Sequence, residues 1–295
     1  MTSVLRSPIL ILEPNIAGSA FNIAPERAQE LADEVAVQRF ALAVTDDKGF
    51  SFRVNTQTHE AKLPIAAMEY VWCTAYVCWL LYQECVQAQA AKADSIDLAA
   101  TDVISSAIDL LKWSAENLAH PGAVPWPAGP KPTAPMGGTV AVDVANELFL
   151  AGLAWILHHE IAHVRLNHGQ VHGALSVQQE KECDLSATQW IVEKCTDPAA
   201  LQKRQLGIVV ALMAMQYLDE PEGTDTYVGS HPPSVERLDD CLGAANADDD
   251  GLMCAFAGVA LQMQLTQLKM QAPLDGDSIR DIFSGFLVRY RTEGR

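Results

Sequence analysis

The sequence predicts an α+β protein that is mostly helical, with a small antiparallel β-sheet at its N-terminus. Short stretches rich in β-branched and aromatic residues lie before residue 65, and longer segments with a helical spacing of apolar residues follow it. At 295 residues and 49% hydrophobic content, the chain can bury a sizeable core. We therefore expect one domain over residues 1–295, strand-rich over 1–65 and mainly helical over 66–295.

Four N-terminal stretches are predicted to be strands, because β-branched and aromatic side chains suit a pleated, half-buried surface. They cover residues 8–12, 35–44, 50–55 and 60–64. The run Asp46-Asp-Lys-Gly49 is typical of a hairpin turn between the second and the third of them. These strands would form the small, mostly antiparallel sheet.

The rest of the chain is predicted to be helical. The spacing of apolar residues indicates helices at about residues 66–90, 101–118, 144–168, 177–194, 198–217, 233–242, 252–270 and 278–291. One interruption is long, since residues 120–138 hold six prolines and four glycines. This loop either acts as a lid or activation element anchored by Trp126, or is an ordered surface crossing.

Charge and cysteine content narrow the class of protein. The 37 acidic and 20 basic residues give a formal net charge of -17, which argues against binding to nucleic acid or to an anionic membrane surface. Seven cysteines without a C-x-x-C pair, and a start without a signal segment, predict reduced thiols and a cytoplasmic protein. The most apolar stretch, residues 64–82, carries Glu69 and has no positive flank, so we interpret it as a buried core helix.

The most informative motif is H-E-x-x-H, formed by His159, Glu160 and His163. Histidines four apart lie on one face of a helix, so their imidazoles can converge on one metal ion. Glu160 stands one step round the helix and can reach a water whose pKa the metal lowers. The alternative is a structural role, in which buried histidines are satisfied by hydrogen bonds in the core. That role would account for one of the histidines, but not for two histidines and a glutamate together on so apolar a segment. The pattern therefore predicts a catalytic zinc site.

Such a site needs a third protein ligand, and two glutamates are candidates. His168 falls one position short of the third histidine of the metzincin pattern, which here is Gly169. We favour Glu180 on the next helix, because Asp184 shares its face and can orient a ligand imidazole. Glu182, the other candidate, would point roughly 160° away from that face. The alternative interpretation is that the segment with Glu180 and Glu182 is the solvent-exposed, acidic first part of a helix and binds no metal.

A third signal is the segment H-P-P-S-V-E-R, from His231 to Arg237. Its two prolines favour a helix start, which lets Arg237 pair with a buried carboxylate of the site, Asp184 or Glu180. His231 is the best candidate to donate a hydrogen bond to the oxyanion that develops during hydrolysis, with Tyr227 second.

Together these motifs resemble the gluzincin metallopeptidases of the CAAX-processing and HtpX kind, in which H-E-x-x-H is followed by E-x-x-[AC]-D and H-P-P-x-x-x-R. A closer resemblance, over nearly the whole chain, is to the Lit family of phage-exclusion peptidases. The segments that carry it are Ser7-Pro8-Ile9, Phe21-Asn-Ile-Ala-Pro-Glu26, Ala154-Trp-Ile-Leu-His-His-Glu-Ile-Ala-His163, Thr188-Gln-Trp190 and His231-Pro232.

This resemblance implies a zincin-like helical core with one zinc ion, held by His159, His163 and Glu180, and Glu160 as general base. It also implies a bacterial endopeptidase of abortive infection that is latent until a phage peptide or protein appears, and that then cuts elongation factor Tu. One departure from the related pattern is Cys183, where alanine is usual. The thiol is either a packing residue or an adventitious ligand, and we favour packing.

Two other functions stay open from the sequence. One is a non-catalytic, zinc-containing module that senses phage, which predicts that Glu160 can be replaced without loss of effect. The other is a protease that cleaves a transcriptional repressor or another regulator, which predicts that a different host protein acquires a new terminus.

Overall fold

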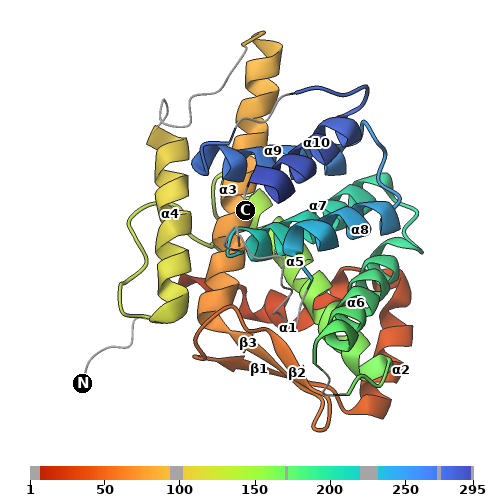
Figure 1. Ribbon diagram of the computed structural model, residues 1–295. Helices are drawn as coiled ribbons and strands as arrows, with labels where there is room; N and C mark the ends of the chain where they lie inside the picture. Colours follow the sequence, from red (N-terminus) through yellow and green to blue (C-terminus); the bar gives the residue numbers. More distant parts are fainter. Residues whose placement is uncertain (1–6, 94–101, 170–171, 220–231, 271–273, 294–295) are drawn as a thin grey trace.

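A computed structural model describes residues 7–93, 102–169, 172–219, 232–270 and 274–293 of the chain (Figure 1). Helices dominate these residues, and a small sheet of three strands lies at one end of the helical body. The predicted fold class, α+β and mostly α, is confirmed. A continuous apolar core joins buried side chains from Ile9 to Leu287.

The first segment of the chain is helical where strands were expected. The 3₁₀ helix η1 (Pro8–Leu12) begins after Ser7, whose side chain accepts a hydrogen bond from the backbone N–H of Ile9. Three more helical elements follow, namely α1 (Glu13–Asn22), η2 (Pro25–Arg27) and α2 (Ala28–Gln38). The predicted strand at residues 8–12 is therefore wrong, and so is the first half of the one at 35–44. A short apolar run such as PILIL does not distinguish a strand from a buried helical turn.

The sheet is mixed rather than antiparallel. β1 (Ala41–Thr45) pairs in parallel with β3 (Glu60–Pro64), and β2 (Arg53–Asn55) pairs antiparallel with the other side of β3. The turn expected at residues 46–49 thus does not join two paired strands, and the hairpin is formed by β2 and β3 instead.

Contacts of the connection between β1 and β2 explain this order. The backbone N–H of Gly49 donates to the carbonyl of Leu118 in α4 (Asp102–Ala119), and the ring of Phe50 packs edge-on against Tyr70. The chain therefore leaves the sheet after β1, and β3 takes the central position when the chain returns. These are contacts between distant residues, which a turn signal in the sequence cannot report.

Two long apolar helices, α3 (Ile65–Ala90) and α5 (Val140–Arg165), pack against each other in the core. Both are long and apolar enough to cross a membrane, but 83% and 67% of their most apolar windows are buried inside the fold. This is the burial expected of core helices, as predicted for residues 64–82. The C-terminal half of α5 passes beside the sheet (Figure 1).

The remaining helices agree with the predicted ones to within a few residues at their ends. α6 contacts both α5 and α8, while α9 and α10 pack on each other at the opposite end of the body (Figure 1). This arrangement brings α5, α6, α8 and the sheet together. The bounds of these helices are α6 (Ala174–Val192), α7 (Pro198–Gln216), α8 (Ser234–Ala244), α9 (Leu252–Gln267) and α10 (Ile279–Glu293).

The loop over residues 120–138 lies at the far end of α5 from the H-E-x-x-H motif. Trp126 packs against Trp113 of α4, and Asn146, in the first part of α5, donates a side-chain hydrogen bond to the loop backbone. Asn146 lies about 20 Å along the helix axis from His159, at 1.5 Å per residue. The loop is therefore anchored by Trp126 and does not cover the motif.

The position of α5 depends on a close crossing with α7. A Cβ added at Gly207 would lie 2.5 Å from the Cβ of Ala151 and 2.9 Å from the backbone nitrogen of Gly152. Because backbone atoms cannot move aside singly, Gly207→Ala should lower the free energy of unfolding by about 1–3 kcal/mol. Urea unfolding measures this change. Gly258→Ala is the matched control, since that helical glycine has open space around it, and equal losses in both variants would contradict the prediction.

Candidate metal centre

The two motif histidines lie in the C-terminal half of α5 and present their Nε2 atoms to each other at 3.2 Å. Helix periodicity accounts for this, since residues four apart stand above one another on one face. His159 and Glu160 are 5% and 8% exposed, so both polar side chains are buried. Groups of this kind are costly to bury unless they are paired or bind a metal.

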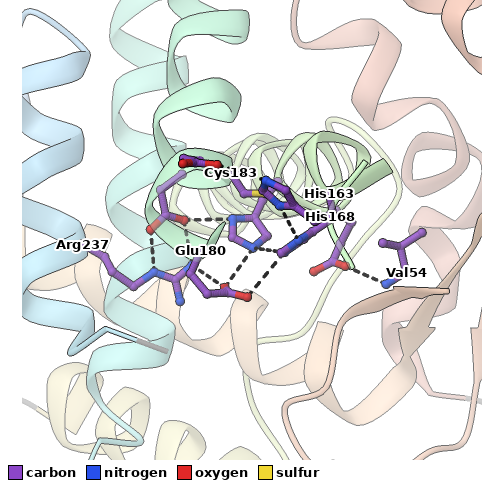
Figure 2. A network of polar contacts seen from close by, with 10 residues as sticks. Val54, His163, His168, Glu180, Cys183 and Arg237 are labelled. Atoms are coloured by element: carbon purple, nitrogen blue, oxygen red, sulfur yellow. Dashed lines mark hydrogen bonds and ion pairs between the residues drawn. The ribbon is translucent and has the colours of Figure 1, made fainter. Parts of the chain in front are cut away.

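Glu180 of α6 completes a group of three, which we call the carboxylate site. Its Oε2 lies 3.2 Å from His159 Nε2, and its Oε1 lies 3.4 Å from His163 Nε2 (Figure 2). In a tetrahedral zinc site with bonds of about 2.0–2.1 Å, the ligand atoms stand about 3.3 Å from one another. The donors of His159, His163 and Glu180 therefore fit a single ion placed between them.

Asp184 and Arg237 fix His159 from its other side. The Nδ1–H of His159 donates to Asp184 Oδ1 at 2.9 Å, and Arg237 of α8 donates to both oxygens of Asp184 at 2.7 Å. Burial raises the pKa of Asp184, but the charge of Arg237 and the hydrogen bond from His159 outweigh it and lower the pKa below its ordinary value. Asp184 is thus a carboxylate that directs Nε2 of His159 toward Glu180.

The arrangement of atoms at the centre of the carboxylate site favours a positive charge there, either a proton or a metal ion. Nε2 of His159 faces a carboxylate oxygen and a second imidazole, so lone pairs converge there. Burial lowers the pKa of His159, yet its hydrogen bonds to Asp184 and Glu180 outweigh this effect and raise the pKa to about 9. A proton satisfies the lone pairs when no metal is bound, and a metal ion must displace it.

Glu160 turns away from these ligands toward the sheet. Its Oε2 accepts a 2.6 Å hydrogen bond from the backbone N–H of Val54 in β2. Val54 and Arg237 lie on opposite sides of the histidines (Figure 2). β2 is an edge strand, and Val54 stands opposite Ala61 in a pair whose backbone groups point away from β3. The free edge of β2 therefore faces the carboxylate of Glu160.

A second group, which we call the thiol site, lies against the other ring nitrogen of His163. After the end of α5, Asn167 lies in the left-handed region (φ 54°), and the backbone N–H of His168 donates to the carbonyl of His163. This turn places His168 Nδ1 3.2 Å from His163 Nδ1. Cys183 Sγ is 3.4 Å from the same His168 nitrogen, and Glu182 Oε2 is 3.1 Å from His168 Nε2.

Most of the predicted site residues thus lie in one buried network. Glu182, the second candidate for third ligand, contacts His168 and not the carboxylate site. His231 and Tyr227, expected to donate to the oxyanion, lie outside the described residues. The residues brought together are His159, Glu160, His163, Glu180, Asp184 and Arg237.

Two contacts of the site were not foreseen from the sequence. The first is the contact of His168 with the end of α5, which depends on the left-handed conformation of Asn167. An asparagine just after the last turn of a helix is a sequence signal that could have predicted this contact. Val54 meets Glu160 across 106 residues of sequence, and its partner atom is a backbone N–H. No side-chain pattern points to such a donor.

His158, next to the motif, should make the protein sensitive to acid. It is fully buried, its Nε2–H donates to the carbonyl of Ala20, and desolvation lowers its pKa to about 3. The unfolded chain binds a proton below its pKa of about 6.5, whereas the folded chain does not. Stability from this residue is therefore present above that pH and lost as pH falls, by about 2 kcal/mol at pH 5.

Urea unfolding at pH 7 and pH 5 measures this loss, with His158→Phe as the comparison. Phenylalanine keeps a flat ring against Trp190, which stacks on His158 at 5.6 Å, but does not titrate. The variant should lose less stability than the parent protein on acidification, while loss of metal ligation affects both equally. The same loss in both proteins would contradict the pKa assigned to His158.

Comparisons with known proteins bear on this site. Residues 62–259 match the family model described as peptidase U49. The chain is 35% identical over 289 residues to the cell death peptidase of Escherichia coli (strain K12), an alignment that covers 96% of this chain and 97% of that relative. No solved structure matches. The span that matches the family model holds both groups of candidate metal ligands.

Proposed function

The chain belongs to the peptidase U49 family, and from this premise we propose that it is a zinc-dependent endopeptidase of phage exclusion. The observation that carries the proposal is the carboxylate site, with two imidazole nitrogens and one carboxylate at separations that suit a tetrahedral zinc ion. The name of the Escherichia coli relative, cell death peptidase, supports a role in which the host cell is sacrificed.

The residues of the site have distinct tasks in peptide hydrolysis. His159, His163 and Glu180 would hold the zinc ion, which would supply a Lewis acid for the scissile carbonyl and lower the pKa of a bound water. Glu160 takes a proton from the attacking water and returns it to the leaving amine. The N–H of Val54 holds one oxygen of Glu160 and leaves the other able to accept. Asp184 and Arg237 keep the first histidine ligand in one tautomer and one orientation.

The position of β2 favours an extended peptide as substrate. The N–H of Val54 on the free edge of β2 is bonded to Glu160, and an extended segment can pair with the backbone of β2 beside that contact. A peptide bound in this way would run past the general base. For the oxyanion we propose His231 as hydrogen-bond donor, because it stands just before α8, the helix whose Arg237 joins the site.

The biological setting is proposed from the family and from the relative. We propose a cytoplasmic protein that is latent until a phage-derived peptide or protein binds, and that then cleaves elongation factor Tu. A net charge of -17 suits a basic segment on the activator or substrate.

Sequencing of new protein N-termini by mass spectrometry in phage-infected cells tests this function. A new terminus in elongation factor Tu, seen only in infected cells that carry the protein, would support substrate and latency together. A new terminus in a repressor, and none in elongation factor Tu, would support the endopeptidase activity but show that the substrate is the repressor. Protection of the culture without any new terminus would overturn the endopeptidase and favour a phage-sensing module.

A further inference from the structure

His163 offers each of its two ring nitrogens to a different set of ligand atoms. Nε2 faces His159 and Glu180 in the carboxylate site, and Nδ1 faces His168 in the thiol site. The outward nitrogen of a metal-bound histidine ordinarily donates to a carboxylate, a carbonyl or water. Here it meets an imidazole nitrogen instead, with a cysteine sulfur beside it. This is the donor chemistry of a second metal site.

The spacing of the thiol site agrees with that interpretation. For zinc bonds of about 2.0–2.1 Å to nitrogen and about 2.3 Å to sulfur, tetrahedral angles place two nitrogens about 3.3 Å apart and a nitrogen and a sulfur about 3.5 Å apart. The observed separations are 3.2 Å from His163 Nδ1 to His168 Nδ1 and 3.4 Å from His168 Nδ1 to Cys183 Sγ. The ligand atoms of all three residues lie within 4.8 Å of one another.

The surroundings of the thiol site repeat those of the carboxylate site. Glu182 Oε2 lies 3.1 Å from Nε2 of His168, as Asp184 lies 2.9 Å from Nδ1 of His159. In each site a carboxylate of α6 thus directs the opposite nitrogen of a histidine toward the shared imidazole. α6 also supplies an anionic ligand to each site, Glu180 in one and Cys183 in the other. Cys183 is fully buried, which protects a thiolate ligand from oxidation.

We propose that His163, His168 and Cys183 bind a second divalent cation of the zinc class, joined to the ion of the proposed function through the imidazolate of His163. The thiol site takes zinc, and accepts Co²⁺ or Cd²⁺, because a thiolate and two imidazoles select such ions over Mg²⁺ or Ca²⁺. Binding releases two protons, one from the Cys183 thiol and one from Nδ1 of His163.

The charges of the site can accommodate two ions. Bonded to opposite nitrogens of one ring, they stand about 6 Å apart, and their repulsion is offset by the imidazolate, the thiolate and the nearby carboxylates of Glu160, Glu180 and Glu182.

Titration of the metal-free full chain with Co²⁺ tests the proposal without any assay of activity. The readouts are the thiolate-to-cobalt absorption band in the near ultraviolet and the number of ions retained after dialysis. Wild type should retain two ions per chain and show the band. Cys183→Ala and His168→Gln should each retain one and lose the band, while Cys254→Ala, at another buried cysteine, should behave as wild type.

Glu180→Gln separates this proposal from the proposed function. It should lose the ion of the carboxylate site and keep the thiolate band. One retained ion without a band in wild type would overturn the thiol site and leave the proposed function standing. A single ion whose band disappears in both Glu180→Gln and Cys183→Ala would mean one mixed site, and would also overturn the assignment. Thermal unfolding verifies the fold of each variant, and Cys183→Ser, which keeps the side-chain size, replaces Cys183→Ala if that variant fails to fold.

Discussion

A Glu160→Gln variant should lose about 10²- to 10⁴-fold of the peptidase activity and still bind zinc as wild type does. Glutamine keeps the size of the side chain and its carbonyl oxygen can still accept from Val54, so the fold of β2 against α5 is preserved. It cannot take a proton from water at neutral pH. Because Glu160 is outside the group of His159, His163 and Glu180, removal of its charge does not remove a ligand.

The measurement is the count of new protein termini and of surviving cells in phage-infected cultures, with zinc content determined on the purified proteins. Glu147→Gln is the matched control, because Glu147 lies on the same helix with 56% of its side chain exposed, in an ion pair with Lys203. That variant should cleave as wild type does. If Glu160→Gln still produced the new termini, Glu160 would not be the general base. If Glu160→Gln protected the culture fully without producing new termini, the metal site would have a structural role and not a catalytic one.

Arg237→Ala should lower the free energy of unfolding by about 3–5 kcal/mol, because it leaves the carboxylate of Asp184 buried without its cation. Arg237 is 4% and Asp184 1% exposed, and two hydrogen bonds of 2.7 Å join them. The same change should weaken zinc binding about 10- to 100-fold, since Asp184 would no longer be held to orient His159. Urea unfolding and zinc competition with a chromogenic chelator measure the two effects.

Two comparisons make this prediction specific. Arg237→Lys keeps the charge but loses the planar fork, so it should lie between wild type and Arg237→Ala in both measurements. Lys112→Ala removes a cation from an exposed pair with Asp109, whose side chains are 66% and 70% exposed, and should change stability by less than about 1 kcal/mol. A loss for Arg237→Ala no larger than that of Lys112→Ala would show that the buried pair does not stabilise the fold.

The sequence by itself determined the parts of this protein that depend on neighbours along one helix. Four-residue spacing placed His159 above His163 on α5, and Glu180 on the face of Asp184 on α6. The long helices were predictable for the same reason, because their apolar periodicity extends over many turns. These features follow from 3.6 residues per turn and need no knowledge of what the helix packs against.

Only the tertiary structure decided the rest. Arg237 was expected to pair with Asp184 or Glu180, and the packing of α8 on α6 selects Asp184, 53 residues away in sequence, as the bidentate partner. The order of the sheet followed from contacts of Gly49 and Phe50 with helices later in the chain. The donor to Glu160 is a backbone N–H, which no residue type identifies. Each depends on how distant segments pack, and local sequence does not encode the distance or direction of that packing.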